Sequence, residues 1–363
     1  MKILIDIGHP AHVHYLKKFI PIMEEKGHSL FIVARDKEIA LQLLDFYKFP
    51  YLNRGKGSNG KVGKLVYMLR ADLLIFRHAL KIKPDVFLSF GSMYAAQIAW
   101  LIGKPHIALD DTDHNFFQQA LYIPFTKVLL TPKVFQKDFG SRQIRFDSFL
   151  ELFSLHPKRF IPVPGVVEAI LNESKENRYV ILRFVSWEAS HDAGLKGLSS
   201  EDKYTLVRQL SRYARVIISS ESTLPADLMD YAYAVHPAEM HDILHGASLL
   251  ISESLTMAAE AAFLGTPSLC ISTARAGTLD EEVKLGLIEL FRTSDGLLQR
   301  ALYILLNPDY KPAFKAWSHE KIRSKVDLTA FLVWFVEMFP QSKEILKNQP
   351  GYPQEHFTEL SSS

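Results

Sequence analysis

The sequence predicts an α/β protein made of two doubly wound domains, each with a parallel sheet covered by helices. Three observations favour this fold. The 363 residues exceed the roughly 100 to 200 of a typical domain. Short apolar segments alternate with longer amphipathic segments, as in repeated βαβ units. Near the middle of the chain, residues 156–164 contain three prolines that interrupt this alternation.

The first domain is expected over residues 1–160, beginning with the apolar strand 2–7. Gly27 directly follows Lys26, as is typical of the residue that ends a helix. Further strands are expected at 29–34, 86–89, 106–109 and 127–130, with helices at 12–26, 37–47, 63–81 and 93–101.

Residues 161–176 are expected to form a linker and residues 177–326 the second domain. Its predicted strands are 178–184, 216–219, 232–235, 249–252, 268–271 and 288–290, and its predicted helices are 201–213, 238–245 and 256–264. A final helix within 327–345 is apolar on nearly every side, so we expect it to be buried near the domain interface. Residues 346–363 are expected to form a mobile tail. Two such Rossmann-like domains would face a cleft, with ligands at the carboxyl ends of the strands.

The composition excludes several classes of protein. Lys plus Arg total 42 and Asp plus Glu total 40, a net charge of +2 that gives no indication of nucleic-acid binding. Cys270 is the only cysteine, so neither an intrachain disulfide nor a thiolate metal cluster can form, and a cytoplasmic location is the expectation. No apolar stretch has the length of a transmembrane helix or of a signal peptide.

The segment 249–267 is the most informative part of the sequence. An apolar strand leads through a small polar turn into an Ala-rich helix that ends at Gly265. The N-terminus of such a helix can bind a diphosphate, with Ser254 and Thr256 as hydroxyl donors. Glu260, one turn further, could accept hydrogen bonds from ribose hydroxyls. The alternative is an ordinary capped helix with one exposed glutamate.

The segment 252–267, together with 110–114, 183–192 and 236–241, resembles the nucleotide-sugar signature of GT-B glycosyltransferases and of UDP-N-acetylglucosamine 2-epimerases. Among these, the chain most resembles the predicted glycosyltransferases of the DUF354 family. The resemblance implies a GT-B-like fold, phosphate contacts at Ser254, Leu255 and Thr256, and a ribose contact at Glu260. Met257, in the same segment, is a further candidate for substrate binding. Many relatives have a glycine pair where this sequence has Ser254 and Leu255.

Four further residues are candidates for substrate binding in the second domain. Arg183, at the end of its first strand, could stabilise the leaving diphosphate, unless it pairs with a carboxylate of the other domain. Trp187 and His191 could line the sugar pocket, and His236 begins another of the matching segments.

Three histidines follow the first strand of the chain. A neutral imidazole suits the removal of a proton from an acceptor hydroxyl. His12 is the preferred base because it matches the spacing of the catalytic histidine in small-molecule GT-B glycosyltransferases, and His9 and His14 are its neighbours. A zinc site or a helix-start role are the alternatives.

Acidic residues follow the fourth strand of the first domain. Asp110 or Asp111 could hold the imidazole of His12 in the manner of a catalytic triad. Residues 111–113 also read as a DxD sequence, but the two-domain pattern argues against the metal-dependent class, so no metal and no cofactor are expected. The alternative is a cluster that caps the next helix.

Residues 54–83 form a local basic region with interspersed apolar side chains. A basic amphipathic helix can lie on an anionic membrane, which would suit a lipid-linked acceptor. A partly buried core helix is the alternative.

Taken together, these features predict a metal-independent, inverting glycosyltransferase that moves a sugar from a nucleotide-sugar donor to a hydroxyl acceptor, with polysaccharide or glycolipid synthesis as a setting. A UDP-N-acetylglucosamine 2-epimerase-like isomerase and a nucleotide-sugar-binding protein without turnover are the alternatives.

Overall fold

The computed structural model describes residues 1–37, 39–58, 60–113, 115–172, 177–185, 197–233, 235–274 and 276–359, with Lys61 described by its backbone alone. The chain divides into two compact units. The first comprises Met1–Arg159 and Ser324–Ser363, and the second comprises Phe160–Arg323.

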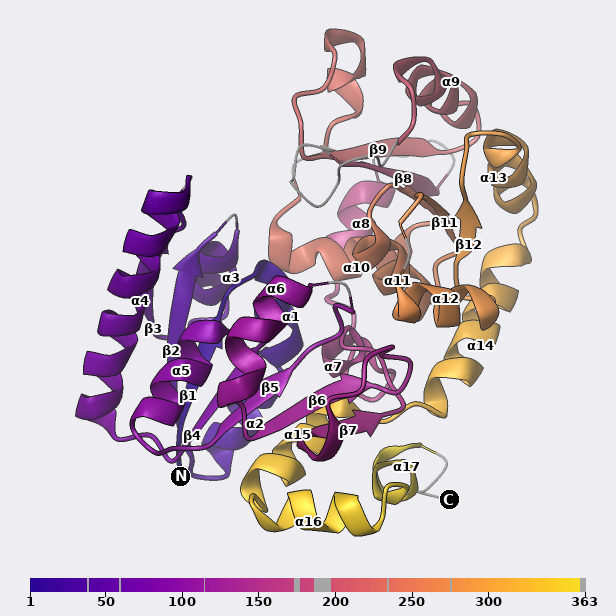
Figure 1. Ribbon diagram of the computed structural model, residues 1–363. Helices are drawn as coiled ribbons and strands as arrows, with labels where there is room; N and C mark the ends of the chain where they lie inside the picture. Colours follow the sequence, from indigo (N-terminus) through magenta and orange to yellow (C-terminus); the bar gives the residue numbers. More distant parts are fainter. Residues whose placement is uncertain are drawn as a thin grey trace. The chain divides into compact units, whose positions relative to one another are not determined.

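The first unit contains a seven-stranded parallel sheet in the order β3-β2-β1-β4-β5-β6-β7 (Figure 1). Its strands are β1 Lys2–Ile7, β2 Ser29–Asp36, β3 Tyr51–Lys56, β4 Val86–Phe90, β5 His106–Leu109, β6 Val128–Pro132 and β7 Gln143–Phe146. The direction in which strands are added reverses between β1 and β4. In doubly wound sheets, ligands bind at the carboxyl ends of the strands beside such a reversal.

The helices of the first unit are α1 Pro10–Leu16, α2 Phe19–Glu25, α3 Ala40–Phe46, α4 Lys61–Ile82, α5 Met93–Leu101, α6 Phe116–Tyr122, α7 Leu152–Leu155, α15 Leu328–Glu337, α16 Gln341–Asn348 and α17 Tyr352–Phe357. The helix predicted at 12–26 is two helices, α1 and α2. Pro21 explains the break, because a proline ring clashes with the carbonyl four residues earlier, at Lys17.

The C-terminal helices belong to the first unit. The apolar side chains of α15 are buried, as the sequence predicts, and the helix packs against α2 and α7. Beyond residue 346, where the sequence predicts a mobile tail, α16 continues and α17 follows. The ring of Tyr352 in α17 stacks on Trp334 of α15 at 4.8 Å between ring centroids, so aromatic packing holds this segment.

The second unit contains a five-stranded parallel sheet in the order β12-β11-β10-β8-β9. Its strands are β8 Tyr179–Phe184, β9 Arg215–Ser220, β10 Leu249–Ser252, β11 Ser268–Ile271 and β12 Glu289–Phe291. Its helices are α8 Val166–Leu171, α9 Ser200–Leu210, α10 Met240–Gly246, α11 Leu255–Phe263, α12 Gly277–Lys284, α13 Leu297–Leu306 and α14 Tyr310–Arg323.

Of the strand predicted at 232–235, the described residues 232, 233 and 235 belong to no strand. Ala232 makes a single bridge to Ile218, because 3-10 helices at Ala226–Tyr231 and Pro237–Glu239 occupy the chain on either side. Among the described residues, no helix is long and apolar enough to cross a membrane.

Candidate functional site

A buried ion pair lies at the carboxyl end of β1. Nε of Arg54, from β3, donates to Oδ1 of Asp6 at 3.0 Å, and both side chains are almost fully buried. The hydroxyl of Ser92, after β4, donates to the other carboxylate oxygen. Removing either charge would leave the other desolvated and unpaired, so the pair ties together the ends of these strands.

Aromatic rings of the first unit surround the Arg54 guanidinium. Nη1 donates to the hydroxyl of Tyr67 at 2.6 Å, and the guanidinium lies 4.5 Å from the ring centroid of Tyr94. Burial raises the pKa of Asp72 in α4 to about 6. We refer to Asp6, Arg54, Tyr67, Asp72 and Tyr94 as the Arg54 cluster, which the sequence analysis missed although Asp6 stands inside an otherwise apolar strand.

The three predicted histidines have different surroundings. Nδ1 of His9 accepts from the backbone N–H of Ala11 at 3.2 Å and so caps α1. His12 stacks on Phe90, at the end of β4, with 4.4 Å between ring centroids. His14 is buried and meets the ring of Tyr47 edge-on at 6.5 Å. Of the three, His12 is the one placed next to the end of a central strand.

The His12 imidazole is held in its neutral form. Burial lowers its pKa well below the ordinary 6.5, and the nearby cationic groups of His9, Lys37 and Arg54 lower it further. Nδ1 accepts from the backbone N–H of Gly8 at 3.3 Å. A neutral ring that accepts at Nδ1 carries its proton on Nε2, so the ring must change tautomer before Nε2 can accept a proton.

The acids after β5 are held by their own neighbours. Asp110 accepts from the backbone N–H of Thr112 at 2.9 Å and from the hydroxyl of Tyr122 at 2.5 Å. Asp111 is half-buried and accepts from the Thr112 hydroxyl at 3.1 Å. Burial raises the pKa of both carboxyls, that of Asp111 to about 6 with a further contribution from Asp110. The pKa of the Asp111 carboxyl therefore lies close to neutral pH.

The predicted triad is not assembled in this structure. In the described part of the chain, no hydrogen bond joins His12 to Asp110 or Asp111, because these acids bind Thr112 and Tyr122 instead. The helix-capping alternative does not describe them either, since the N-cap of α6 is Asn115. Within the described ranges, no group of three or more His, Cys, Asp or Glu side chains is arranged to hold a metal ion.

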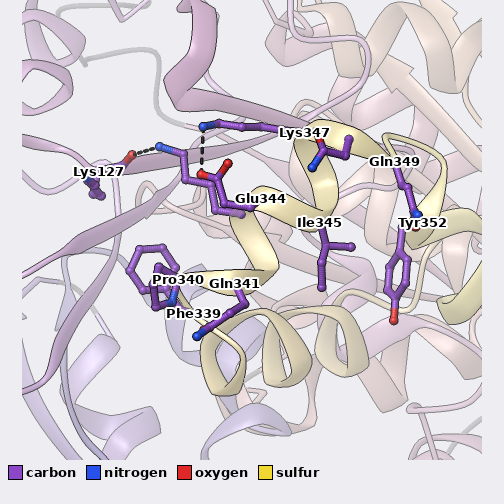
Figure 2. Close-up of a pocket in the computed structure, with 11 residues that line it drawn as sticks. Lys127, Phe339, Pro340, Gln341, Glu344, Ile345, Lys347, Gln349 and Tyr352 are labelled. Carbon is purple, nitrogen blue, oxygen red and sulfur yellow. Dashed lines mark hydrogen bonds and ion pairs between the residues drawn. The ribbon is translucent and has the colours of Figure 1, made fainter.

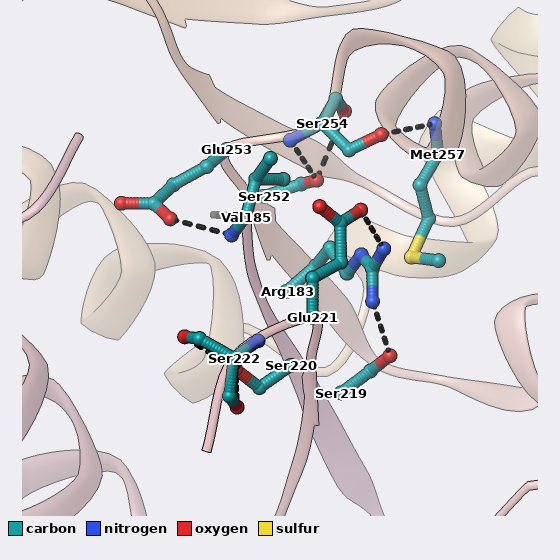
Figure 3. Close-up of polar contacts among 10 residues, drawn as sticks. All are labelled: Arg183, Val185, Ser219, Ser220, Glu221, Ser222, Ser252, Glu253, Ser254 and Met257. Atoms are coloured by element: carbon teal, nitrogen blue, oxygen red, sulfur yellow. Dashed lines mark hydrogen bonds and ion pairs between the residues drawn. The ribbon is translucent and has the colours of Figure 1, made fainter. Parts of the chain in front are cut away.

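In the second unit, Arg183 lies at the end of β8. It is in register with Ser219 of β9 and Ser252 of β10. Nη1 donates to the hydroxyl of Ser219 at 3.0 Å, and Nη2 pairs with the carboxylate of Glu221 (Figure 3). Its Nε is buried and has no partner among the described residues. Arg183 thus forms a salt bridge with a carboxylate of its own unit, whereas the sequence alternative places that carboxylate in the other domain.

The turn from β10 to α11 is held by serine hydroxyls (Figure 3). Ser252 Oγ accepts from the backbone N–H of Ser254 and donates to its carbonyl, both at 2.9 Å. Ser254 is the N-cap of α11 and accepts from the backbone N–H of Met257 at 3.4 Å. Leu255 is half-buried and Thr256 is exposed. The first turn of the helix, which carries the positive end of its dipole, is therefore partly exposed.

Glu253 is a buried carboxylate that the sequence analysis did not single out. Its two oxygens accept from the backbone N–H groups of Val185 at 2.8 Å and Leu198 at 2.6 Å. It therefore joins both ends of the connection that contains Trp187 and His191, two predicted residues that lie outside the described part of the chain. An acid directly after a buried strand is the sequence signal that could have revealed it.

Two of the matching segments meet at Glu260. Its carboxylate lies 3.3 Å from Nε2 of His241, and both side chains are mostly buried. His236, in the same segment as His241, accepts at Nδ1 from the backbone N–H of Ala238 at 3.3 Å and so begins a 3-10 helix. Glu260 is consequently not the freely exposed glutamate of the capped-helix alternative.

A separate hollow of about 830 Å³ lies along α16 (Figure 2). Lys127, which lines it, immediately precedes β6, so the hollow is at the amino ends of the strands. Lys343 donates to the carbonyl of Lys127 at 3.2 Å, and Lys347 pairs with Glu344 at 3.0 Å. The hollow therefore lies at the opposite end of the strands from His12 and the Arg54 cluster.

Comparison with known proteins gives a family and a fold. Residues 1–285 match the family described as "Protein of unknown function (DUF354)". The "Uncharacterized protein MJ0665" of Methanocaldococcus jannaschii is 22% identical over 279 residues, covering 74% of this chain and 81% of that protein.

Two solved structures represent the enzymes that share this fold. The UDP-GlcNAc 2-epimerase from Neisseria meningitidis, bound to UDP-GlcNAc, has a TM-score of 0.65 at 12% identity, covering 93% of this chain and 100% of that chain. The glycosyltransferase VinC, in complex with dTDP, has a TM-score of 0.60 at 12% identity, covering 95% and 100%. Both are GT-B fold enzymes, so the predicted α/β fold is confirmed.

Proposed function

The chain belongs to the DUF354 family, and we propose that it is a glycosyltransferase that takes a nucleotide sugar as donor. The observation that carries the proposal is the arrangement at the carboxyl end of the second sheet. Arg183 is in register with Ser252, and the partly exposed N-terminus of α11 follows two residues later. A guanidinium and a helix N-terminus at neighbouring strand ends form a site for a diphosphate.

In the proposed donor complex, the diphosphate contacts Arg183 and the first turn of α11. Hydrogen bonds from Leu255 and Thr256 backbone N–H groups and from the Thr256 hydroxyl would meet the phosphate oxygens. Glu260 would accept from the ribose hydroxyls, with His241 orienting its carboxylate. Arg183 must release Glu221 to make a bidentate contact with the diphosphate.

The first unit would bind the hydroxyl acceptor and supply the base that removes the proton of the acceptor hydroxyl. His12 is the proposed base, since burial keeps it unprotonated at neutral pH. The acceptor oxygen attacks the anomeric carbon as the bond from that carbon to the diphosphate breaks. Once the ring proton has moved from Nε2 to Nδ1, which ends the hydrogen bond from Gly8, the hydroxyl proton passes to Nε2 of His12. Arg183 stabilises the charge that develops on the diphosphate. Direct displacement inverts the anomeric centre, and the proposal includes no metal.

A second candidate is an isomerase, favoured by one specific observation. The adjacent carboxyls of Asp110 and Asp111 both have raised pKa values, that of Asp111 about 6. Such a pair can take a proton from a sugar carbon and return it. The same donor site would then serve an epimerase of the UDP-GlcNAc class, with a histidine as a further proton carrier.

A thermal-shift screen of nucleotide sugars tests the donor site, because a ligand that binds the folded state raises its melting temperature. We expect a UDP- or dTDP-sugar to raise it, and the free nucleoside to raise it much less. A screen in which no nucleotide or nucleotide sugar stabilises the chain would contradict the proposal.

Incubation of the stabilising nucleotide sugar with the enzyme alone separates the two activities. Appearance of a second sugar nucleotide without an acceptor identifies an epimerase. A transferase should leave the donor essentially intact until a hydroxyl acceptor is supplied, and EDTA should not change its turnover. Restoration of EDTA-inhibited activity by manganese or magnesium would overturn the metal-free mechanism.

A further inference from the structure

The helix α4 has two chemically different faces. Ala71, Ile75 and Ala79 are buried in the core of the first unit, and Tyr67 reaches Arg54. The opposite face carries exposed apolar side chains: Val62, Leu65, Val66, Leu69, Leu73 and Leu80. At 3.6 residues per turn, these six positions fall within an arc of about 100°. The core-helix alternative thus describes the inner face of α4, and the membrane-surface alternative stays a prediction for the outer face.

Each side chain of this apolar stripe is about half exposed or more. Val62 is 76% exposed and Leu69 is 59% exposed. The stripe runs from Val62 to Leu80, about 27 Å at 1.5 Å per residue. Exposed apolar side chains in a continuous row, unlike scattered ones, mark a surface that contacts another apolar phase.

Cationic side chains border one margin of the stripe. Arg70, Arg77 and Lys81 are exposed there and line a hollow of about 420 Å³ beside Leu52 of β3. Asp72 is the only acid in residues 61–83, and it belongs to the Arg54 cluster. The outer surface of α4 is therefore basic along one margin of the apolar stripe.

We propose that the outer face of α4 docks on a membrane surface that contains anionic lipid. The apolar stripe would enter the boundary of the acyl chains, while Arg70, Arg77 and Lys81 meet lipid phosphates, with the hollow open to a headgroup. A second copy of the chain fits less well, because symmetric pairing of two such faces would bring rows of cations close together.

Docking by α4 is a property beyond the proposed sugar transfer and does not depend on it. Because Tyr67 of the same helix binds Arg54, a docked α4 would hold the carboxyl end of the first sheet near the lipid. A lipid-linked hydroxyl acceptor would then reach that end of the sheet from the membrane. Only this consequence rests on the proposed function.

Flotation of the full chain with lipid vesicles tests the docking. We expect binding to vesicles of mixed phosphatidylserine and phosphatidylcholine, weak binding to pure phosphatidylcholine, and release at high salt. Replacing Arg70, Arg77 and Lys81 together by Gln should weaken binding on the order of 100-fold, at about fivefold per charge. Equal binding to both vesicle types, or none to either, would overturn the proposal.

The apolar contribution is tested by Leu69→Gln combined with Leu73→Gln, two changes at exposed positions that should leave the melting temperature nearly unchanged. Leu306→Gln, at a similarly exposed position of the second unit, is the matched control and should float like the wild type. Nucleotide affinity should be the same in all variants, so a failure of docking is distinguishable from a failure of the donor site. If the double variant instead abolishes a concentration-dependent dimer and leaves flotation unchanged, the face binds a second copy and the membrane proposal is wrong.

Discussion

The carboxyl ends of the two sheets differ in how they use charge. In the first unit, Arg54 and Asp6 neutralise each other in a buried ion pair, and burial suppresses the charge of the remaining groups: His12 is held neutral, and the pKa values of Asp110 and Asp111 are raised. In the second unit, charges and dipoles are retained at Arg183 and at the N-terminus of α11. Suppressed charge suits proton transfer and retained positive charge suits anion binding, so the difference supports a division between an acceptor unit and a donor unit.

The largest effect is expected from His12→Ala, which removes the proposed base. Transfer should slow by about 10² to 10⁴ because a base acts in the transition state, while nucleotide affinity stays the same. Product formation with a hydroxyl acceptor and calorimetric titration of UDP measure the two quantities. His9→Ala and His14→Ala are the controls and should have smaller effects on rate. Equal rate losses in all three variants would indicate a structural role for the histidine segment.

The pH dependence of the rate distinguishes His12 from Asp111 as the base. A base must be deprotonated, so the rate should fall on the acid side as the pH drops through its pKa. A limb near pH 6 corresponds to the pKa of Asp111, and a limb at lower pH corresponds to His12. If Asp111→Asn abolishes sugar transfer together with the limb near pH 6, Asp111 is the base and not His12.

The next largest effect is expected on stability, from Glu253→Ala. This change leaves the half-buried backbone N–H of Val185 and the buried backbone N–H of Leu198 without their acceptor. At about 1 to 3 kcal/mol for each of the two unsatisfied groups, the free energy of unfolding should fall by about 2 to 6 kcal/mol. Denaturant titration measures the loss. Glu320→Ala is the control at an exposed glutamate, and a similar stability for both variants would contradict the role of Glu253.

A smaller effect is expected on binding, from Glu260→Ala. Losing a hydrogen-bonded acceptor costs about 1 to 3 kcal/mol, so UDP affinity should fall about 5- to 150-fold. Calorimetry on the folded variant measures this change. His241→Ala keeps the carboxylate but removes its partner and should weaken UDP less. Unchanged UDP affinity in Glu260→Ala would contradict the predicted contact between Glu260 and the ribose.

The smallest effect is the pH-dependent stability change of Asp111→Asn. The folded pKa of about 6 lies above the unfolded value of about 3.9, so this carboxyl binds more protons when folded and its contribution to stability falls as the pH rises through that window. The variant should gain about 1 to 2 kcal/mol relative to the wild type between about pH 4 and pH 7, a figure reduced because Asp111 is partly accessible. Urea titrations at the two pH values measure the gain, and a gain independent of pH would contradict the raised pKa.

The sequence predicted the central strands of both sheets but missed the edge strands of the first sheet. Strands β1, β5, β10 and β11 have the predicted bounds because they are buried on both faces and read as continuous apolar runs. The edge strands β3 and β7 were missed. Tyr51–Lys56 and Gln143–Phe146 each have one neighbouring strand and tolerate polar residues, so they carry no continuous apolar run.

Side-chain partners were the least predictable part of the site. The histidine and acid segments were recognised at the ends of β1 and β5, but the hydrogen bonds of Asp110 and His12 depend on Tyr122 and Gly8, whose positions follow from packing. Two other contacts join distant parts of the chain. Glu260 pairs with His241, and Glu253 accepts hydrogen bonds from the backbone N–H groups of Val185 and Leu198. No spacing in a single sequence encodes such contacts.

Calorimetric titration of UDP into the wild type, Arg183→Ala and His12→Ala tests the division between the two units most directly. If the second unit binds the donor diphosphate, Arg183→Ala should weaken UDP binding about 10- to 150-fold, since a hydrogen bond to a charged group contributes about 1.5 to 3 kcal/mol. His12→Ala should bind UDP like the wild type. Loss of UDP binding in His12→Ala with full binding in Arg183→Ala would place the nucleotide on the first unit and contradict the account.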